Sequence, residues 1–119
     1  MLLVNDDEGL APFRDFLLNH MRDGKLEFDG IFCNTDRLAF NVRGMLNELN
    51  LRVPEDVQLI GFDGIRMFGS GELYCSTIVQ PVSQLAETAV DILLQEDRSH
   101  LPSLICLPVS YVSDRTTKE

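Results

Sequence analysis

The sequence predicts an α/β protein in which a parallel sheet is flanked by helices. Short apolar runs occur at residues 30–34 and 57–61, and they are too short for surface helices and typical of buried strands. Between them, residues 36–49 carry apolar side chains at helical spacing. Strands that are apolar on both faces and alternate with helices in the order β-α-β-α-β are typical of parallel sheets.

The N-terminal part predicts one strand and one helix. Residues 2–4 form a short apolar run at the very start of the chain, so we expect the domain to continue beyond this end. Pro12 suits the first turn of a helix, and Gly24 suits a stop signal after it. The expected buried face of this helix consists of Phe13, Phe16, Leu17, His20 and Met21.

The central part predicts two strands around a helix. Asp36 is the expected N-cap of the helix at residues 36–49, and Asn50 is expected to end it in the left-handed conformation. The strand at 57–61 is followed by a glycine-rich segment, residues 63–71. The expected core stripe of the helix is Leu38, Val42, Met45, Leu46 and Leu49.

The C-terminal part predicts a short extended segment at residues 77–79, a helix at 83–96 and two β-like runs at 104–107 and 109–112. Ser83 is the expected N-cap of the helix. Apolar residues cover more of this helix than a one-sided surface helix needs. We therefore expect it to pack against partners that these 119 residues do not supply.

Composition favours one soluble domain, or a large part of one, and excludes several functions. The chain has 119 residues, 45% of them hydrophobic, and a net charge of -9 that opposes the phosphate backbone of nucleic acids. No apolar run is long enough to span a membrane, and the first residues do not form a signal peptide. Three cysteines without a Cys-x-x-Cys pair indicate reduced, structural thiols and a cytoplasmic protein without metal or cofactor.

Polar residues follow three of the predicted strands, where parallel sheets bind ligands. Asp63 ends the strand at 57–61, and its carboxylate can accept hydrogen bonds from sugar hydroxyls or a purine amine. The alternative is that Asp63 caps its own loop. Asn34 and Thr35 follow the preceding strand and can present amide and hydroxyl groups, and Asp7 follows the first strand in the same way.

Exposed apolar residues indicate a protein interface. Phe40 lies on the face of its helix opposite the core stripe, which it shares with Arg37. Met67 and Phe68 lie in a loop that is otherwise polar. Groups of this size at the surface predict self-association. The alternative is local packing of Phe40 on Met67 or Phe68.

Enzymatic function is not indicated. The chain contains no Gly-x-Ser-x-Gly elbow, His-Glu-x-x-His pair or Walker loop. Its two histidines are far apart, and His20 lies on an apolar helix face. The glycines at 69 and 71 precede no convincing helix, so a dinucleotide-binding fingerprint is excluded.

The chain resembles the effector-binding core of the LacI/GalR family of bacterial transcriptional repressors. Matching segments are DGIFC at 29–33, DRLA at 36–39, LRVPEDVQLIGFD at 51–63, STIVQP at 76–81, LAETAVDILL at 85–94 and DRTT at 114–117. Their order and spacing agree over essentially the whole chain. Within the family, the sequence looks most similar to sugar operon repressors of Gram-positive bacteria, including the sucrose type.

The resemblance implies a periplasmic-binding-protein-like fold with the effector between two subdomains. Residues 1–119 then form a partial effector-binding domain, mainly its C-terminal subdomain, with 83–96 as a crossover helix to the other subdomain. It further implies a homodimer that contacts operator DNA only through an N-terminal domain absent from this chain. The family's dimers meet where Arg37, Phe40, Met67 and Phe68 lie.

Effector contacts carried over from the family fall on the same edge. Asp63 matches the acid that bonds effector hydroxyl or amine groups, and Thr35 matches the polar position before the helix. Phe32 matches a position that stacks on the ligand in purine-binding members. Asp7 matches a position that is often aromatic in sugar binders, so its side chain departs from that pattern.

These observations together predict a sugar-sensing or sugar-phosphate-sensing part of a DNA-binding repressor. The main alternative is an extracytoplasmic sugar-binding protein of the same fold, which a secretory leader upstream would distinguish from a repressor.

Overall fold

The computed structural model describes residues 9–96, 100 and 102–118. The predicted strand at 2–4 and Asp7 lie outside these residues. The described elements are α1 (Ala11–Asn19), β1 (Met21–Arg22), β2 (Lys25–Leu26), β3 (Gly30–Phe32), α2 (Asp36–Glu48), β4 (Gln58–Asp63), β5 (Ser76–Val79), α3 (Val82–Leu94) and β6 (Ser110–Val112).

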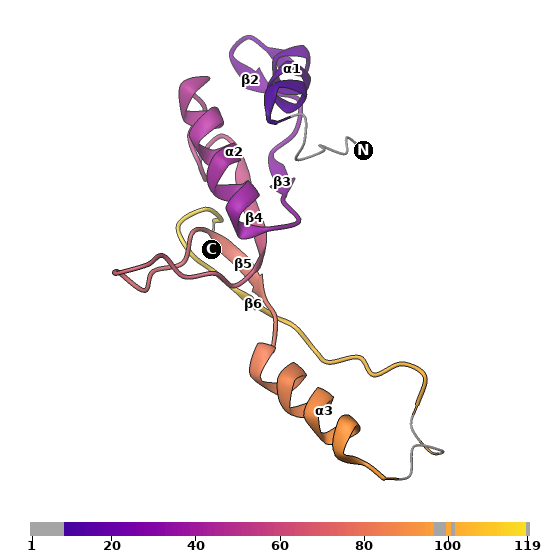
Figure 1. Cartoon of the computed structure of the whole chain (residues 1–119). Coiled ribbons are helices and arrows are strands. Elements are labelled where there is room, and N and C mark those ends of the chain that lie inside the picture. The colour runs from indigo at the N-terminus through magenta and orange to yellow at the C-terminus, as the bar shows by residue number, and fades with distance from the viewer. Residues whose placement is uncertain (1–8, 97–99, 101, 119) are drawn as a thin grey trace.

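A four-stranded sheet in the order β3-β4-β5-β6 organises the molecule (Figure 1). The pairs β3–β4 and β4–β5 are parallel, whereas β6 runs antiparallel to β5. The predicted α/β class is therefore confirmed, with an antiparallel edge strand added to the parallel sheet. The predicted strand at 104–107 is wrong, because only residues 110–112 of the closing segment pair with the sheet.

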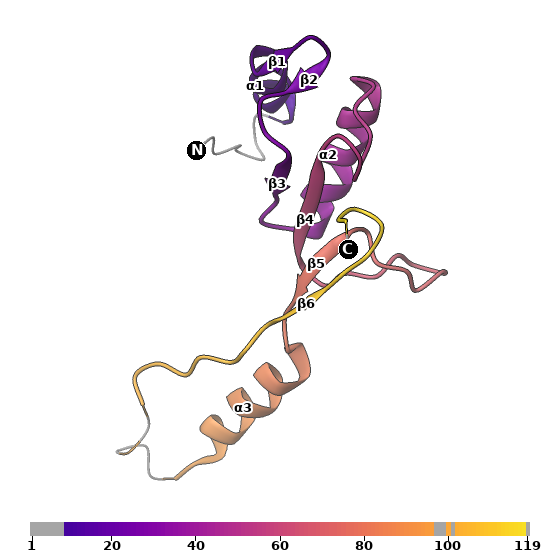
Figure 2. The same cartoon turned by 180° about the vertical axis from the view of Figure 1, so that it is seen from behind.

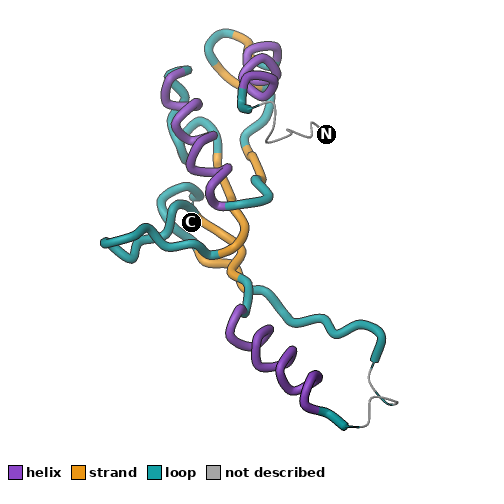
Figure 3. Tube along the Cα trace, viewed as in Figure 1, coloured by secondary structure: helices purple, strands orange, loops and turns teal. Residues whose placement is uncertain are grey.

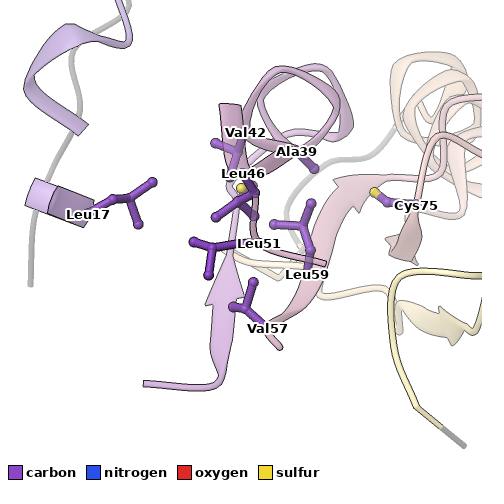
Figure 4. Packing of buried hydrophobic residues seen from close by; sticks show 9 residues of the cluster. Leu17, Ala39, Val42, Leu46, Leu51, Val57, Leu59 and Cys75 are labelled. Carbon is purple, nitrogen blue, oxygen red and sulfur yellow. The ribbon is translucent and has the colours of Figure 1, made fainter. Parts of the chain in front are cut away.

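The hydrophobic core lies between α2 and the sheet, as predicted. Figure 4 shows Leu17 of α1 pointing toward side chains of α2 and of the residues around β4. On α2, Val42 and Leu46 of the predicted stripe are fully buried, and its other residues pack partly buried around them. Ala39, which the predicted stripe did not include, is fully buried as well. Burial of these aliphatic side chains, each worth roughly 1.5–3 kcal/mol, holds α2 on the sheet.

The end of α1 differs from the prediction. The helix ends at Asn19, and Met21 lies in a two-stranded hairpin instead of on the helix. Asp23 and Gly24 occupy the turn with φ of 53° and 75°. Asp-Gly with two positive φ values is the preferred two-residue hairpin turn, so the signal was present in the sequence.

Both predicted helix caps need correction. The N-cap of α2 is Thr35, whose side chain accepts a hydrogen bond from the Leu38 amide, so Asp36 is the first helical residue. In α3 the N-cap is Pro81, and Ser83 lies inside the helix. The predicted left-handed conformation of Asn50 is confirmed, with φ of 58°.

The helix α3 extends away from the sheet (Figures 1 and 2). The chain measures 63 × 30 × 25 Å with a radius of gyration of 18.3 Å. A compact domain of this length has a radius of gyration of about 13–14 Å. No described residue of α3 is buried, and apolar side chains such as Leu93 and Leu94 are 66% and 75% exposed. Within the part of the chain that the structure describes, α3 therefore keeps its apolar side chains largely exposed.

Residues near the C-terminus form hydrogen bonds with the amino-terminal ends of β4 and β5. Thr116 is fully buried beside the first residues of β4 and β5. Its hydroxyl donates to the Leu59 carbonyl at 2.7 Å and accepts from the Ser76 amide at 2.8 Å. The Leu59 amide in turn donates to the Thr116 carbonyl at 2.8 Å. The DRTT segment thus satisfies backbone groups that the strands leave unpaired.

Candidate functional site

The carboxyl ends of β3, β4 and β5 meet at one edge of the sheet because these strands are parallel. Phe32 pairs in register with Ile60, and Asp63 pairs with Val79. The residues that follow each strand therefore share this edge, which is where open α/β sheets bind ligands. The predicted site residues on β3 and β4 come together here, as the sequence indicated.

Asp63 is held in an uncommon geometry at the end of β4. It is half-buried, and its φ of 123° lies in a region that non-glycine residues rarely adopt. The Gln80 side-chain amide donates to Asp63 Oδ1 at 2.8 Å. Strained residues of this kind persist where the surrounding structure determines them, often at ligand sites. The hydrogen bond to this carboxylate therefore comes from the residue that follows β5 at the same edge.

Gln80 is a site residue that the sequence reasoning missed. It follows β5 directly, so it stands at the same edge as Asp63. Its position could have been found, because the rule that placed Asp63 and Thr35 at strand ends applies equally to residue 80. The Asp63 carboxylate can accept hydrogen bonds from a polar ligand, and the side-chain carbonyl of Gln80 supplies a further acceptor beside it.

The β3 side of the edge contributes Phe32, Asn34 and Thr35. The Phe32 ring is 64% exposed, which leaves an aromatic face open at this edge. Asn34 is exposed, and Thr35 is half-buried. Because the Thr35 hydroxyl oxygen accepts from the Leu38 amide at 3.1 Å, its hydrogen remains to donate. Asp7, the fifth predicted residue, lies outside the described residues.

A buried carboxylate lies beneath this edge. Asp36 is fully buried, and its Oδ2 accepts from the Ile65 amide at 2.6 Å. Its Oδ1 accepts from the Thr77 hydroxyl at 2.6 Å and from the Cys75 thiol at 3.7 Å. These donors, together with the N-terminal end of α2, offset the cost of burying the negative charge.

Glycine at residue 61 makes room for this carboxylate. A Cβ added there would overlap Asp36 Oδ1 and stand 2.8 Å from the Cys75 sulfur. Gly64 has a φ of 78°, and a Cβ added there would lie 2.9 Å from the two methyl carbons of Val79, which is too close. The two glycines bracket Asp63, so the backbone on both sides of it is closely fitted.

Two buried thiols lie near each other, and one of them, that of Cys75, donates to the same carboxylate. Burial raises the pKa of the Cys33 thiol to about 12, with a smaller contribution from the neighbouring Cys75. Burial, followed by the negative charge of Asp36, raises the pKa of the Cys75 thiol to about 12. Both side chains are therefore neutral thiols, consistent with the predicted structural role. Cys106 is exposed.

The predicted interface residues occupy the outer face of α2 and the loop after β4. Phe40 packs edge-on against Tyr74 with ring centroids 5.3 Å apart, and the Arg43 guanidinium lies 5.7 Å from the centre of the Phe40 ring. Phe68 is fully exposed in the loop that projects from the sheet (Figure 3). Among the described rings, the partner of Phe40 is Tyr74.

Two neighbouring hollows lie along α2 and share Leu10 and Asn41 among their lining residues. One of about 280 Å³ is lined by Thr35, Arg37 and Asn41 together with residues 9, 10 and 38. Another of about 440 Å³ includes Phe40 and Arg43. A third, of about 510 Å³, lies at the opposite edge of the sheet and is lined by residues 25–29, 55 and 56. Only the first includes a predicted effector residue.

Two features are absent from the part of the chain that the structure describes. Within residues 9–96, 100 and 102–118, no three His, Cys, Asp or Glu side chains are placed to hold a metal ion. In the same part of the chain, no helix has the length and apolarity needed to cross a bilayer.

Comparisons with known proteins identify the family. Residues 6–116 match the model of the periplasmic binding protein-like domain. The chain belongs to this family. It is 35% identical over 86 residues to the sucrose operon repressor of Streptococcus mutans, a match that covers 71% of the chain and 27% of that repressor. The chain thus spans about a quarter of the length of this curated relative.

Solved structures place this family member with the LacI-type regulators. The lac repressor dimer bound to operator superposes with a TM-score of 0.70 at 28% identity, covering 89% of this chain and 36% of that one. A ribose-bound LacI family regulator from Enterococcus faecium gives a TM-score of 0.62 at 30% identity, covering 92% and 40%. The chain is therefore effector-binding domain sequence of LacI type, and its relatives are transcriptional repressors rather than enzymes.

Proposed function

We propose that this chain contributes one wall of a sugar-binding cleft in a LacI-type transcriptional repressor. The observation that carries the proposal is the Asp63–Gln80 pair at the sheet edge shared with Thr35 and Phe32. A carboxylate beside an amide offers acceptors for adjacent sugar hydroxyls, Thr35 offers a donor, and the exposed Phe32 ring offers an apolar face for the ligand. The sucrose operon repressor among the relatives and the ribose-bound regulator support a sugar.

The second wall of the cleft comes from residues beyond this subdomain. Residues 83–96 serve as a crossover helix, and the exposed apolar faces of Leu93 and Leu94 support this role because they need cover. Sugar binding between the two walls favours one relative arrangement of the subdomains and so alters operator affinity. The net charge of -9 supports DNA contact through a separate domain, in the cytoplasm where operators lie.

The repressor acts as a homodimer through the outer face of α2 and the projecting loop. Exposed Phe40 and Phe68, with Met67 and Arg37 beside them, support this assignment. Sedimentation equilibrium of the chain and of a Phe40→Ser/Phe68→Ser double variant tests it. We expect a concentration-dependent dimer that the double variant weakens, and a monomer at all concentrations would contradict it.

Isothermal titration calorimetry tests the proposed sugar site. A repressor that carries both walls of the cleft, with these 119 residues as one of them, is titrated with sucrose, fructose, glucose, ribose and fructose 6-phosphate. We expect one of these to bind, and Asp63→Asn to weaken binding at least about tenfold, because hydrogen bonds to a charged acceptor contribute roughly 1.5–3 kcal/mol. Asp15→Asn, an equal charge change on the exposed side of α1, is the matched control. Equal affinity of the two variants would contradict a role of Asp63.

A further inference from the structure

The buried carboxylate of Asp36 stands apart from the groups that face a ligand. It is fully buried, and among the described residues its carboxylate accepts from the Ile65 amide, the Thr77 hydroxyl and the Cys75 thiol, which are neutral donors from other parts of the chain. A charge held this way costs stability unless its hydrogen bonds are complete. A neutral side chain would fill the same space at lower cost. The charge therefore calls for a role besides packing.

The donors to Asp36 surround the backbone on which Asp63 is mounted. Its Oδ2 holds the amide of Ile65, two residues after Asp63. Its Oδ1 accepts from the Thr77 hydroxyl, and the Thr77 oxygen in turn accepts from the amide of Gly64 at 3.3 Å. Two consecutive amides after Asp63 are thus tied to one carboxylate, directly and through one hydroxyl.

The Asp36 carboxylate is also connected to the Thr35 side of the sheet edge, because the two residues are neighbours in the chain. Asp36 is the first residue of α2 and follows Thr35 directly. Glycine at residue 61 lets β4 approach the Asp36 backbone, with an added Cβ only 3.1 Å from Asp36 Cα. The side chain therefore spans from the Thr35 end of the edge to the Asp63 end.

We propose that Asp36 is a positioning residue for the effector site, which sets the spacing and orientation of Asp63 relative to Thr35 from beneath the sheet edge. It touches no ligand itself. Its action passes through the amides of Gly64 and Ile65, which hold the backbone at Asp63 in its positive φ. The proposal concerns the geometry of the edge and rests on the proposed function only for its effect on sugar affinity.

The test uses four variants of the 119-residue protein, compared by ¹H–¹⁵N NMR spectra and amide hydrogen exchange. Asp36→Asn keeps the volume but replaces one acceptor by a donor, and Thr77→Val removes the bridging hydroxyl. Thr77→Ser keeps that hydroxyl, and Asp15→Asn repeats the charge change at an exposed position. Should Asp36→Asn fail to fold, the Thr77 pair carries the test.

We expect Asp36→Asn and Thr77→Val to raise exchange at the Gly64 amide at least about tenfold, equal to roughly 1.4 kcal/mol, and to shift the side-chain amide signal of Gln80. Thr77→Ser and Asp15→Asn should leave both unchanged. The proposal would be overturned if Thr77→Val and Thr77→Ser showed the same exchange rate at the Gly64 amide and the same side-chain amide signal of Gln80. A merely structural role would lower stability without this local pattern.

Calorimetry with sucrose and ribose separates the two proposals. If the unmodified protein binds either sugar, Asp36→Asn is expected to bind it at least about tenfold more weakly, and unchanged affinity would overturn the positioning role. If the unmodified protein binds neither sugar, the sugar assignment fails for these ligands. The exchange pattern at Gly64 then still decides the role of Asp36.

Discussion

Replacing Gly61 by alanine tests the close fit beneath the sheet edge. The added methyl group would overlap Asp36 Oδ1 and press on the Cys75 sulfur. Overpacking of this kind costs about 1–3 kcal/mol, and displacing a hydrogen bond to the buried carboxylate costs about 1.5–3 kcal/mol more. We expect Gly61→Ala to lower the free energy of unfolding by about 3 kcal/mol or more.

Urea denaturation followed by far-UV circular dichroism measures this effect. With an m-value of roughly 1–3 kcal/mol/M, the loss moves the midpoint down by roughly 1–3 M. Gly44→Ala is the matched control, since Gly44 lies exposed within α2 with open space around its Cα. Alanine there should raise stability by up to about 1 kcal/mol because it favours the helix. Equal midpoints for Gly61→Ala and the unmodified protein would refute the reasoning.

Four further outcomes are expected. Thr116→Val should lower the free energy of unfolding by about 2 kcal/mol or more in urea, because it leaves a buried amide and a buried carbonyl without their partner, whereas Thr116→Ser should keep most of it. At pH 8 a disulfide reagent should modify only Cys106 in the native protein and all three cysteines in denaturant, because Cys33 and Cys75 are buried. In the folded protein the pKa of each of these two thiols is about 12, above the ordinary value near 9, so unfolding releases protons above pH 9. The free energy of unfolding should therefore fall as pH rises from 9 toward 12. The double variant Cys33→Ala/Cys75→Ala should show a smaller fall. In gel shift assays with operator DNA, the chain should give no specific, salt-sensitive complex.

The elements with strong periodicity were predictable from the sequence. The core stripe of α2 follows one helical face, and the strand at residues 57–61 is apolar on both faces, so each pattern has one interpretation. The α1 end was not predicted, because His20 and Met21 continue the helical spacing while Asp23-Gly24 favours a hairpin. The turn prevails because both of its residues tolerate positive φ.

The site was predictable where it depends on strand order alone. Parallel strands bring Thr35 and Asp63 to one edge whatever the details of packing, so the strand-end rule sufficed for them and would have sufficed for Gln80. The rule cannot assign hydrogen bonds. Thr35 and Asp36 are both good N-cap residues, and sequence preference alone does not say which of the two caps α2.

What decides between them is the environment of Asp36, which involves partners 29 and 41 residues away in the chain. If Asp36 capped the helix, its carboxylate would accept from α2 amides, and the Ile65 amide and the Thr77 hydroxyl would lose it as their acceptor. Thr35 takes the cap with a hydroxyl, which releases the stronger acceptor for the loop between β4 and β5. The order Thr-Asp at the start of α2 therefore couples helix capping to the geometry of the proposed effector edge, and exchanging the two residues should disrupt both.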